Sequence, residues 1–279
     1  MKTQINRLLQ RTTGYQLHRT PPTPADGPAP RDGQRILRRP AFVISSVRSG
    51  STLLRVLLDS HSQVHAPHET HLKDIRVEIH SKYAERALKA TKLEVSELQA
   101  LLWDRYLARE LARTGKPQLV NKCPSDAFIV DEIEAAWPDA RFIFLLRHPA
   151  AIARSRQKLR PMDSDERNWE MVERYVSAVE QARQTHQGLT VRYEDLTADP
   201  ERVTRELCDF LGVPWESGML DYGKRRRSFR RGLGDWSDSI KSGEVQPSSP
   251  LPPTSEVPEA LLPLTEAWGY LEPASHDRP

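Results

Sequence analysis

Residues 41–61, AFVISSVRSGSTLLRVLLDSH, constrain the fold more than any other stretch of this chain. The apolar run at 41–46 has the length of a buried strand. After a short serine-rich turn around Gly50, pairs of leucines recur at the spacing of a helix. A buried strand that turns directly into an amphipathic helix is typical of the βα units from which parallel sheets are built.

The same alternation continues along the chain. "ARFIFLLR" at 140–147 has the clearest strand pattern, because it is apolar on both faces, as in a covered parallel sheet. A further helix is expected to be capped by Ser125 or Asp126 and to stop at Pro138. We therefore predict an α/β fold with a central parallel sheet and helices on both faces. The other expected strands are 41–46, 63–66, 117–122 and 188–196, and the other expected helices are 50–61, 71–113, 148–159, 165–187 and 199–212.

Proline marks the two ends of the chain. We expect a helix and a proline-rich linker at 1–40, one domain at 41–245, and a proline-rich tail at 246–279 that docks on the domain. No apolar run is long enough to span a bilayer. The two cysteines offer no disulfide framework, so a cytoplasmic protein is expected, with a transit peptide at the basic N-terminus as the alternative.

Three of the expected strands lead into cations. Arg48 follows the strand at 41–46, Lys122 ends the strand at 117–122, and Arg147 ends the strand at 140–147. Because the carboxyl ends of parallel strands meet at one edge of the sheet, these side chains should lie close together. The sequence therefore predicts a site for a strongly anionic ligand at that edge.

The turn at Gly50 differs from the phosphate-binding loop G-x-x-x-x-G-K-[ST] of nucleotide-triphosphate enzymes. Ser45 replaces the first glycine and Ser51 replaces the lysine, while Thr52 is retained. The strand at 140–147 also ends with Arg147 where a magnesium-binding aspartate would stand. A magnesium-dependent kinase is therefore the weaker alternative. A nucleic-acid binder that uses the basic run at 224–231 is a second alternative, which leaves the three strand-end cations without a role.

Six motifs, which follow the family's order along the chain, resemble those of sulfotransferases that use 3′-phosphoadenosine 5′-phosphosulfate (PAPS). "VRSGSTLLRVLLDSHSQV" is similar to the 5′-phosphosulfate loop of that family, and "LLRHPAAIARS" is similar to its 3′-phosphate motif. "VRYEDLTADP" resembles the segment that follows in the family. "SFRRGLGDW" resembles the R-K-G-x-x-G-D-W segment of cytosolic members, one residue shorter. "NKCP" and "HET" resemble the N-K-x-P and E-E-T of tyrosylprotein sulfotransferases.

The resemblance implies a P-loop-like sulfotransferase fold and a set of cofactor contacts. The 3′-phosphate would be bound by Arg147 and Ser155. Closure over the nucleotide would involve Arg230, Arg231 and Gly232. The 5′-phosphosulfate would be bound by the loop residues Arg48, Ser49, Gly50, Ser51 and Thr52.

The resemblance also implies a catalytic set of Glu69, Lys122 and Arg48. Lys122 would contact the oxygen that bridges the sulfuryl and phosphate groups, where charge develops as the bond breaks. Glu69 would accept the proton of the acceptor hydroxyl, with His68 as the competing base. Cys123 is expected to be a small loop residue.

No metal requirement is expected. The histidines His65, His68 and His71 have helical spacing, but Pro67 interrupts it and no H-E-x-x-H pattern is present. The expected reaction is transfer of a sulfuryl group from PAPS to an acceptor hydroxyl, with adenosine 3′,5′-bisphosphate as product. The acceptor, a small molecule, carbohydrate, lipid or tyrosine, would contact residues 70–115 and 157–175, and no nucleic-acid partner or membrane span is expected.

Overall fold

The computed structural model describes residues 35–224 and 242–271. Within them, five parallel strands form one sheet in the order β2-β3-β1-β4-β5. Val43 of β1 pairs with Lys122 of β3, and Ser45 pairs with Leu145 of β4. The strands are β1 (Ala41–Ser45), β2 (Val64–His65), β3 (Gln118–Lys122), β4 (Arg141–Leu146) and β5 (Gly188–Arg192).

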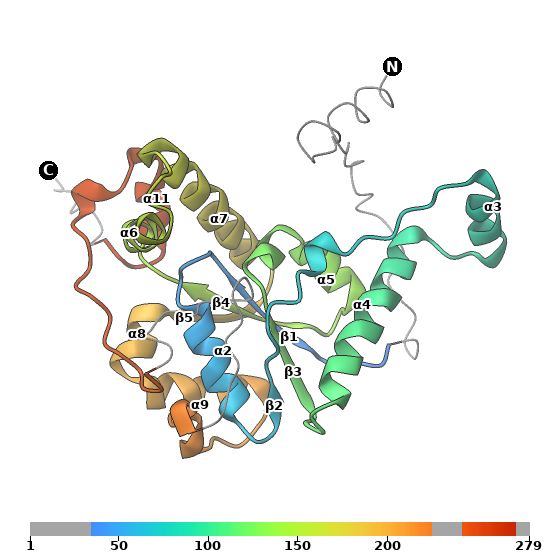
Figure 1. The fold of residues 1–279 in the computed structure, drawn as a ribbon, viewed down its shortest axis with the longest axis horizontal. Helices are drawn as coiled ribbons and strands as arrows, with labels where there is room; N and C mark the ends of the chain where they lie inside the picture. The colour runs from blue at the N-terminus through green and yellow to red at the C-terminus, as the bar shows by residue number, and fades with distance from the viewer. Residues whose placement is uncertain (1–34, 225–241, 272–279) are drawn as a thin grey trace, which may run out of the picture.

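The central strands are covered on both faces, as the apolar pattern of 140–147 predicted. Successive side chains of a strand point to opposite faces, and Phe142 and Phe144 pack in one hydrophobic cluster while Ile143 and Leu145 pack in the other. The first cluster includes residues of α4, α5, α6 and α7, and the second those of α2 and α9 (Figure 1). The helices are α2 (Ser51–Ser60), α3 (Lys82–Thr91), α4 (Val95–Ala112), α5 (Val130–Ala136), α6 (Pro149–Leu159), α7 (Asp165–Thr185), α8 (Tyr193–Ala198), α9 (Pro200–Leu211) and α11 (Leu262–Ala267).

The predicted α/β fold with helices on both faces of a parallel sheet is therefore confirmed. One predicted helix, 71–113, is wrong. It consists of a 3₁₀ turn, η1 (Leu72–Asp74), an extended stretch, and the separate helices α3 and α4. Lys92 ends α3 in the left-handed conformation, with φ 55°, and a capping box of Glu94 and Glu97 starts α4. Because the segment is rich in charged residues, its sequence does not show where one helix ends and the next begins.

Two further boundaries differ from the sequence prediction. The strand at 188–196 stops at Arg192, and the chain turns at once into α8. Neither Ser125 nor Asp126 caps a helix, because Pro124–Phe128 form a 3₁₀ turn, η2, and α5 begins only at Val130. The expected helix at 199–212 is present as α9, capped by Asp199 and ended by Gly212 at φ 71°.

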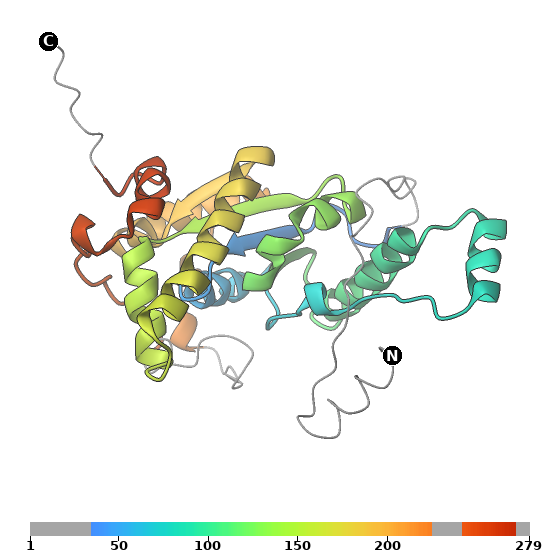
Figure 2. The same cartoon turned by 90° about the horizontal axis from the view of Figure 1, so that it is seen from above.

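Helix α3 lies at the end of an arm, residues 78–98, that projects from the body of the protein (Figures 1 and 2). No residue of this arm is buried. At the other end of the molecule, the described C-terminal segment packs on the first hydrophobic cluster through Val257, Leu261 and Trp268. The Trp268 indole also donates a 2.7 Å hydrogen bond to Glu180 of α7.

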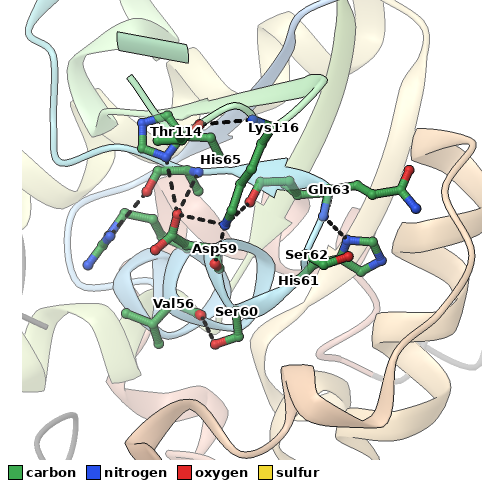
Figure 3. A network of polar contacts seen from close by, with 12 residues as sticks. Val56, Asp59, Ser60, His61, Ser62, Gln63, His65, Thr114 and Lys116 are labelled. Atoms are coloured by element: carbon green, nitrogen blue, oxygen red, sulfur yellow. Dashed lines mark hydrogen bonds and ion pairs between the residues drawn. The ribbon is translucent and has the colours of Figure 1, made fainter. Parts of the chain in front are cut away.

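A network of polar contacts fixes the turn between α2 and β2 (Figure 3). The ammonium of Lys116 donates to the carbonyl oxygens of Asp59 and Val64, both at 2.8 Å. The Asp59 carboxylate accepts from the Ala66 amide at 3.1 Å. His61 accepts from the Gln63 amide through Nδ1 at 2.9 Å, and its Nε2 atom lies 2.6 Å from the carbonyl oxygen of Pro214. These bonds set the path of the chain that leads to Glu69.

Candidate active site

The loop after β1 is open to an anion. Its Ser49 hydroxyl donates to the carbonyl of Ser46 at 2.7 Å, which holds the turn closed. Gly50, the N-cap of α2, has φ 86° and makes no side-chain cap, and the first turn of α2 contains no acidic residue. The first amides of a helix lack intrahelical partners and carry partial positive charge. The start of α2 therefore has the features of a phosphate site, with buried Ser51 and Thr52 in its first turn.

Gly50 lies against the ring of Tyr193, the first residue of α8. A Cβ atom at position 50 would lie 2.1 Å from the Tyr193 Cδ2 atom, so only glycine fits there. The other partner of the ring is Arg147, whose guanidinium carbon lies 4.3 Å from the ring centroid. This contact was not expected, because the predicted strand at 188–196 placed Tyr193 inside the strand, whereas the structure ends β5 at Arg192.

Arg48, Arg147 and Ser155 meet at the edge of the sheet. Arg48 Nε donates to the Ser155 hydroxyl at 3.1 Å, and Arg147 Nη1 donates to the Arg48 carbonyl at 2.7 Å. Arg48 has φ 61°, a left-handed conformation that is unusual for a residue with a side chain and often marks a functional site. The buried Nε–H of Arg147 has no hydrogen-bond partner among the described residues. A free, buried guanidinium donor fits an oxyanion ligand.

A largely buried ion pair lies at the end of the neighbouring strand β3, between Lys122 of that strand and Glu69 of the segment after β2. Lys122 Nζ and Glu69 Oε1 are 2.5 Å apart, and their side chains are 1% and 13% exposed. Burial lowers the pKa of Lys122, the charge of Glu69 opposes this shift, and Arg55 adds to it. The structure thus brings together the two side chains that were expected to act in the chemical step.

Arg55, which the sequence analysis missed, supports this pair from the first turns of α2. Its side chain is buried, and Nη1 donates to the carbonyl of Ala66 at 3.2 Å. A second set of hydrogen bonds fixes the segment that carries Glu69. The Thr70 hydroxyl donates to the side-chain oxygen of Asn121 at 2.9 Å, and the Asn121 side-chain amide donates to the Asp126 carboxyl at 2.7 Å. The sequence did not single out Arg55, because the leucines and valine around it keep the apolar spacing of the helix.

Asp126 is fully buried, and its Oδ1 atom has no partner within the described ranges. Burial raises the pKa of this carboxyl to about 8, against the hydrogen bond from Asn121 and the charge of Lys122. The carboxyl is therefore largely protonated at neutral pH. Its neutrality leaves the Glu69–Lys122 pair as a balanced unit of opposite charges.

His71 and Cys123 lie beside the same pair. His71 has φ 51°, and its Nε2 atom is 3.7 Å from Glu69 Oε2. Its Nδ1 atom is 3.7 Å from the sulfur of Cys123. Cys123 is buried, and burial raises the pKa of its thiol to about 11, which disfavours a role as a nucleophile. His68, the alternative base, is half-buried next to Glu69.

Three expected cofactor contacts, Arg230, Arg231 and Gly232, lie outside the described residues. Across 35–224 and 242–271, no helix combines the length and the apolar character that crossing a bilayer requires.

Comparison with known proteins identifies the family to which the chain is similar. The profile described as "Sulfotransferase family" matches residues 40–217, more than half of the chain. A protein-tyrosine sulfotransferase of Drosophila melanogaster is 26% identical over 211 residues, which cover 68% of this chain and 42% of that protein. For three curated relatives, from Aquifex aeolicus, Drosophila melanogaster and Danio rerio, the share of their own length that is matched lies between 28% and 55%.

Solved structures agree with this family. The sulfotransferase domain of the curacin biosynthetic pathway is 25% identical, with a TM-score of 0.56, and the match covers 85% of this chain and 99% of that chain. The sulfotransferase domain of the Synechococcus PCC 7002 olefin synthase is also 25% identical, with a TM-score of 0.54, over 86% of this chain and 98% of that chain. The predicted P-loop-like sulfotransferase fold is thus confirmed.

The contact of Gly50 with Tyr193 predicts a specific loss of stability. Gly50→Ala should lower the free energy of unfolding by about 1–2 kcal/mol for the left-handed backbone and by a further ~1–3 kcal/mol for the clash. Gly115→Ala is the matched control, because Gly115 has φ 69° and nothing within 4 Å of an added Cβ, so it should show only the first effect. Urea titration measures both, and equal losses at the two positions would contradict the close contact.

A second prediction concerns pH. The neutral Asp126 carboxyl stabilises the fold fully below about pH 4, and this contribution is lost as the pH rises towards its raised pKa of about 8. Asp126→Asn keeps the shape without the titration. The stability of this variant relative to wild type should therefore increase between pH 5 and pH 8, by up to about 1.4 kcal/mol per pH unit. Urea titrations at both pH values measure this change, and a difference independent of pH would refute the buried neutral carboxyl.

Proposed function

The chain belongs to the sulfotransferase family, and from this premise we propose that it transfers a sulfuryl group from PAPS to an acceptor hydroxyl. The products would be a sulfate ester and adenosine 3′,5′-bisphosphate. The observation that carries the proposal is the ion pair of Glu69 and Lys122 at the same sheet edge as Arg48, Arg147 and Ser155. Arg48, Arg147 and Ser155 offer hydrogen-bond donors to an anion. Glu69 and Lys122 form an acid–base pair.

The residues at the sheet edge fit PAPS. The open N-terminus of α2, with Ser51 and Thr52, suits the 5′-phosphosulfate. Arg147, with its unpartnered buried Nε–H within the described ranges, and Ser155 suit the 3′-phosphate. Arg48 connects the two groups, because it belongs to the loop that leads into α2 while its side chain donates to Ser155 and its carbonyl accepts from Arg147.

When bound, PAPS supplies a sulfuryl group whose bond to the 5′-phosphate is the one that breaks. Lys122 holds a fixed positive charge next to that phosphate site and stabilises the negative charge that develops on the leaving oxygen. Glu69 uses one oxygen to hold Lys122, and its second oxygen is left to accept the proton of the attacking hydroxyl. Burial of both side chains strengthens these interactions, because water screens them poorly there.

A magnesium-dependent kinase fits the same site less well. The strand β4 is followed by Arg147 and His148, where such an enzyme needs a carboxylate for the ion. His148 is committed elsewhere, because its Nδ1 atom accepts from the Ala150 amide and caps α6. The side chains at this edge therefore supply the positive charge that magnesium supplies in kinases.

The acceptor is proposed only as a hydroxyl compound. The Drosophila relative is named for protein tyrosine, and the two solved domains come from an olefin synthase and from curacin biosynthesis. These names span a phenolic hydroxyl and two pathways of small-molecule synthesis. For this chain the proposal requires only an acceptor hydroxyl that reaches Glu69.

Nucleotide binding tests the cofactor assignment. Adenosine 3′,5′-bisphosphate should bind without added metal and raise the melting temperature, while AMP, which lacks the 3′-phosphate, should do so much less. Arg147→Lys keeps the charge but removes the planar fork, so it should weaken adenosine 3′,5′-bisphosphate by roughly 10–100-fold with little effect on AMP. Calorimetric titration measures both nucleotides. Equal affinity of wild type for the two would exclude a 3′-phosphate site.

Turnover of matched variants tests the chemical roles. Glu69→Gln and Lys122→Met should each lower the turnover number by roughly 10² or more while adenosine 3′,5′-bisphosphate still binds. His68→Ala should have a smaller effect. Breaking a buried ion pair also destabilises the fold by about 3–5 kcal/mol, so each variant is assayed well below its own melting temperature. If His68→Ala is inactive and Glu69→Gln is active, the base is His68.

A further inference from the structure

Three side chains with metal-binding atoms converge beside the proposed base. One ligand atom from each of Glu69, His71 and Cys123 lies within 4.8 Å of the other two. His71 Nδ1 is 3.7 Å from the Cys123 sulfur, and His71 Nε2 is 3.7 Å from Glu69 Oε2. The sequence could not show this group, because Cys123 follows a different strand from the segment that carries the other two.

The distance between His71 Nδ1 and the Cys123 sulfur is close to that between two ligand atoms of a tetrahedral metal site. With zinc bonds of about 2.3 Å to sulfur and about 2.0–2.2 Å to nitrogen or oxygen, neighbouring ligand atoms in a tetrahedron lie about 3.4–3.6 Å apart. The histidine and cysteine atoms already approach that spacing. The His71 side chain is 42% exposed, so its ring can turn to bring one nitrogen towards both partners.

The backbone holds the ligands in place independently of any ion. His71 lies in the left-handed region and begins the turn η1, which directs its side chain towards Cys123. Cys123 precedes the turn η2, and its sulfur is 3.2 Å from the Ser125 hydroxyl. Contacts between η1 and η2 join the two segments. The cluster is therefore preformed on two turns that pack against each other.

The two oxygens of Glu69 have different neighbours. Oε1 bonds to Lys122, and Oε2 faces His71. An ion bound to Oε2 would leave the Lys122 bond intact and would occupy the oxygen that is free to accept a proton. The nearby ammonium repels a second cation, which favours reversible occupancy over a permanent structural ion.

We propose that Glu69, His71 and Cys123 bind one divalent ion of the zinc class and that this ion inhibits the enzyme. Thiolate and imidazole ligands select zinc, cobalt or cadmium over magnesium and calcium. On binding, the sulfur forms a bond to the ion and the Cys123 thiol releases its proton to solvent. The binding site stands on the geometry alone, and the inhibition rests on the proposed role of Glu69 as base.

Cobalt titration of the full chain tests the site without any assay of activity. One equivalent of Co²⁺ should produce a thiolate-to-cobalt charge-transfer band, and Zn²⁺, but not Mg²⁺, should remove it. Cys123→Ser should abolish the band. Cys208→Ser is the matched control and should retain the band. Cys208 is also buried, but it lies in the second hydrophobic cluster, where its sulfur contacts Met219. A band that survives in Cys123→Ser, or no band in wild type, overturns the site.

His71→Ala provides a second variant that leaves the buried cysteine in place. Loss of one of three ligands should weaken Co²⁺ binding by at least about 10-fold. Unchanged affinity in this variant would show that the ion lies elsewhere.

Inhibition is measured as the ratio of sulfation rates with and without Zn²⁺ for each variant. This ratio should fall in wild type and stay near one in Cys123→Ser. A normal cobalt band without inhibition by Zn²⁺ would overturn the inhibitory role and leave the binding site standing. If no sulfation of any acceptor is found, the cobalt result still decides the site, so its failure is distinct from failure of the proposed function.

Discussion

A lysine ammonium that is only 1% exposed requires a compensating charge, and the carboxylate of Glu69 at 2.5 Å provides it. Much of the surrounding structure serves to keep these two groups together. The polar network of Asp59 and Lys116 sets the path of the chain into β2, and Arg55 holds the carbonyl of Ala66 three residues before the carboxylate. Neutral Asp126 then avoids a second buried negative charge beside the pair.

The parallel register of the sheet explains why the two functional clusters lie side by side. Because Val43 of β1 pairs with Lys122 and Ser45 pairs with Leu145, the strands β3, β1 and β4 end at the same edge. The loop at Gly50 follows the central strand β1, so it lies between the Lys122 side and the Arg147 side. The same geometry accounts for the prediction from sequence that three strand-end cations would serve one anionic ligand.

The local patterns of the sequence predicted the strands, the loop at Gly50 and the sulfotransferase resemblance. They could do so because a buried parallel strand and a glycine-dependent turn depend on residues close together in the chain. Tyr193 and Arg55 were missed because their contacts join separate elements: Tyr193 packs on Gly50, far away in the chain, and Arg55 of α2 bonds to the Ala66 carbonyl beyond β2. Asp126 was expected to cap a helix, because the sequence does not show that its carboxyl is buried beside Asn121. The single helix expected at 71–113 was wrong because residues 78–98, which contain the break between α3 and α4, have no buried face and give no periodic signal there. The roles of the individual site residues remain predictions that the experiments above address.

The unburied arm at residues 78–98 bears on how chains of this kind diversify. A substitution affects folding through the contacts that it removes. Substitutions at exposed positions usually change the free energy of unfolding by no more than about 0.5 kcal/mol. Mutations can therefore accumulate in α3 while the hydrophobic clusters on the two faces of the sheet stay intact. An evolving lineage could in this way replace or lengthen the arm, and alter what the protein meets at that end, without rebuilding the sheet edge where Arg147 and Lys122 lie.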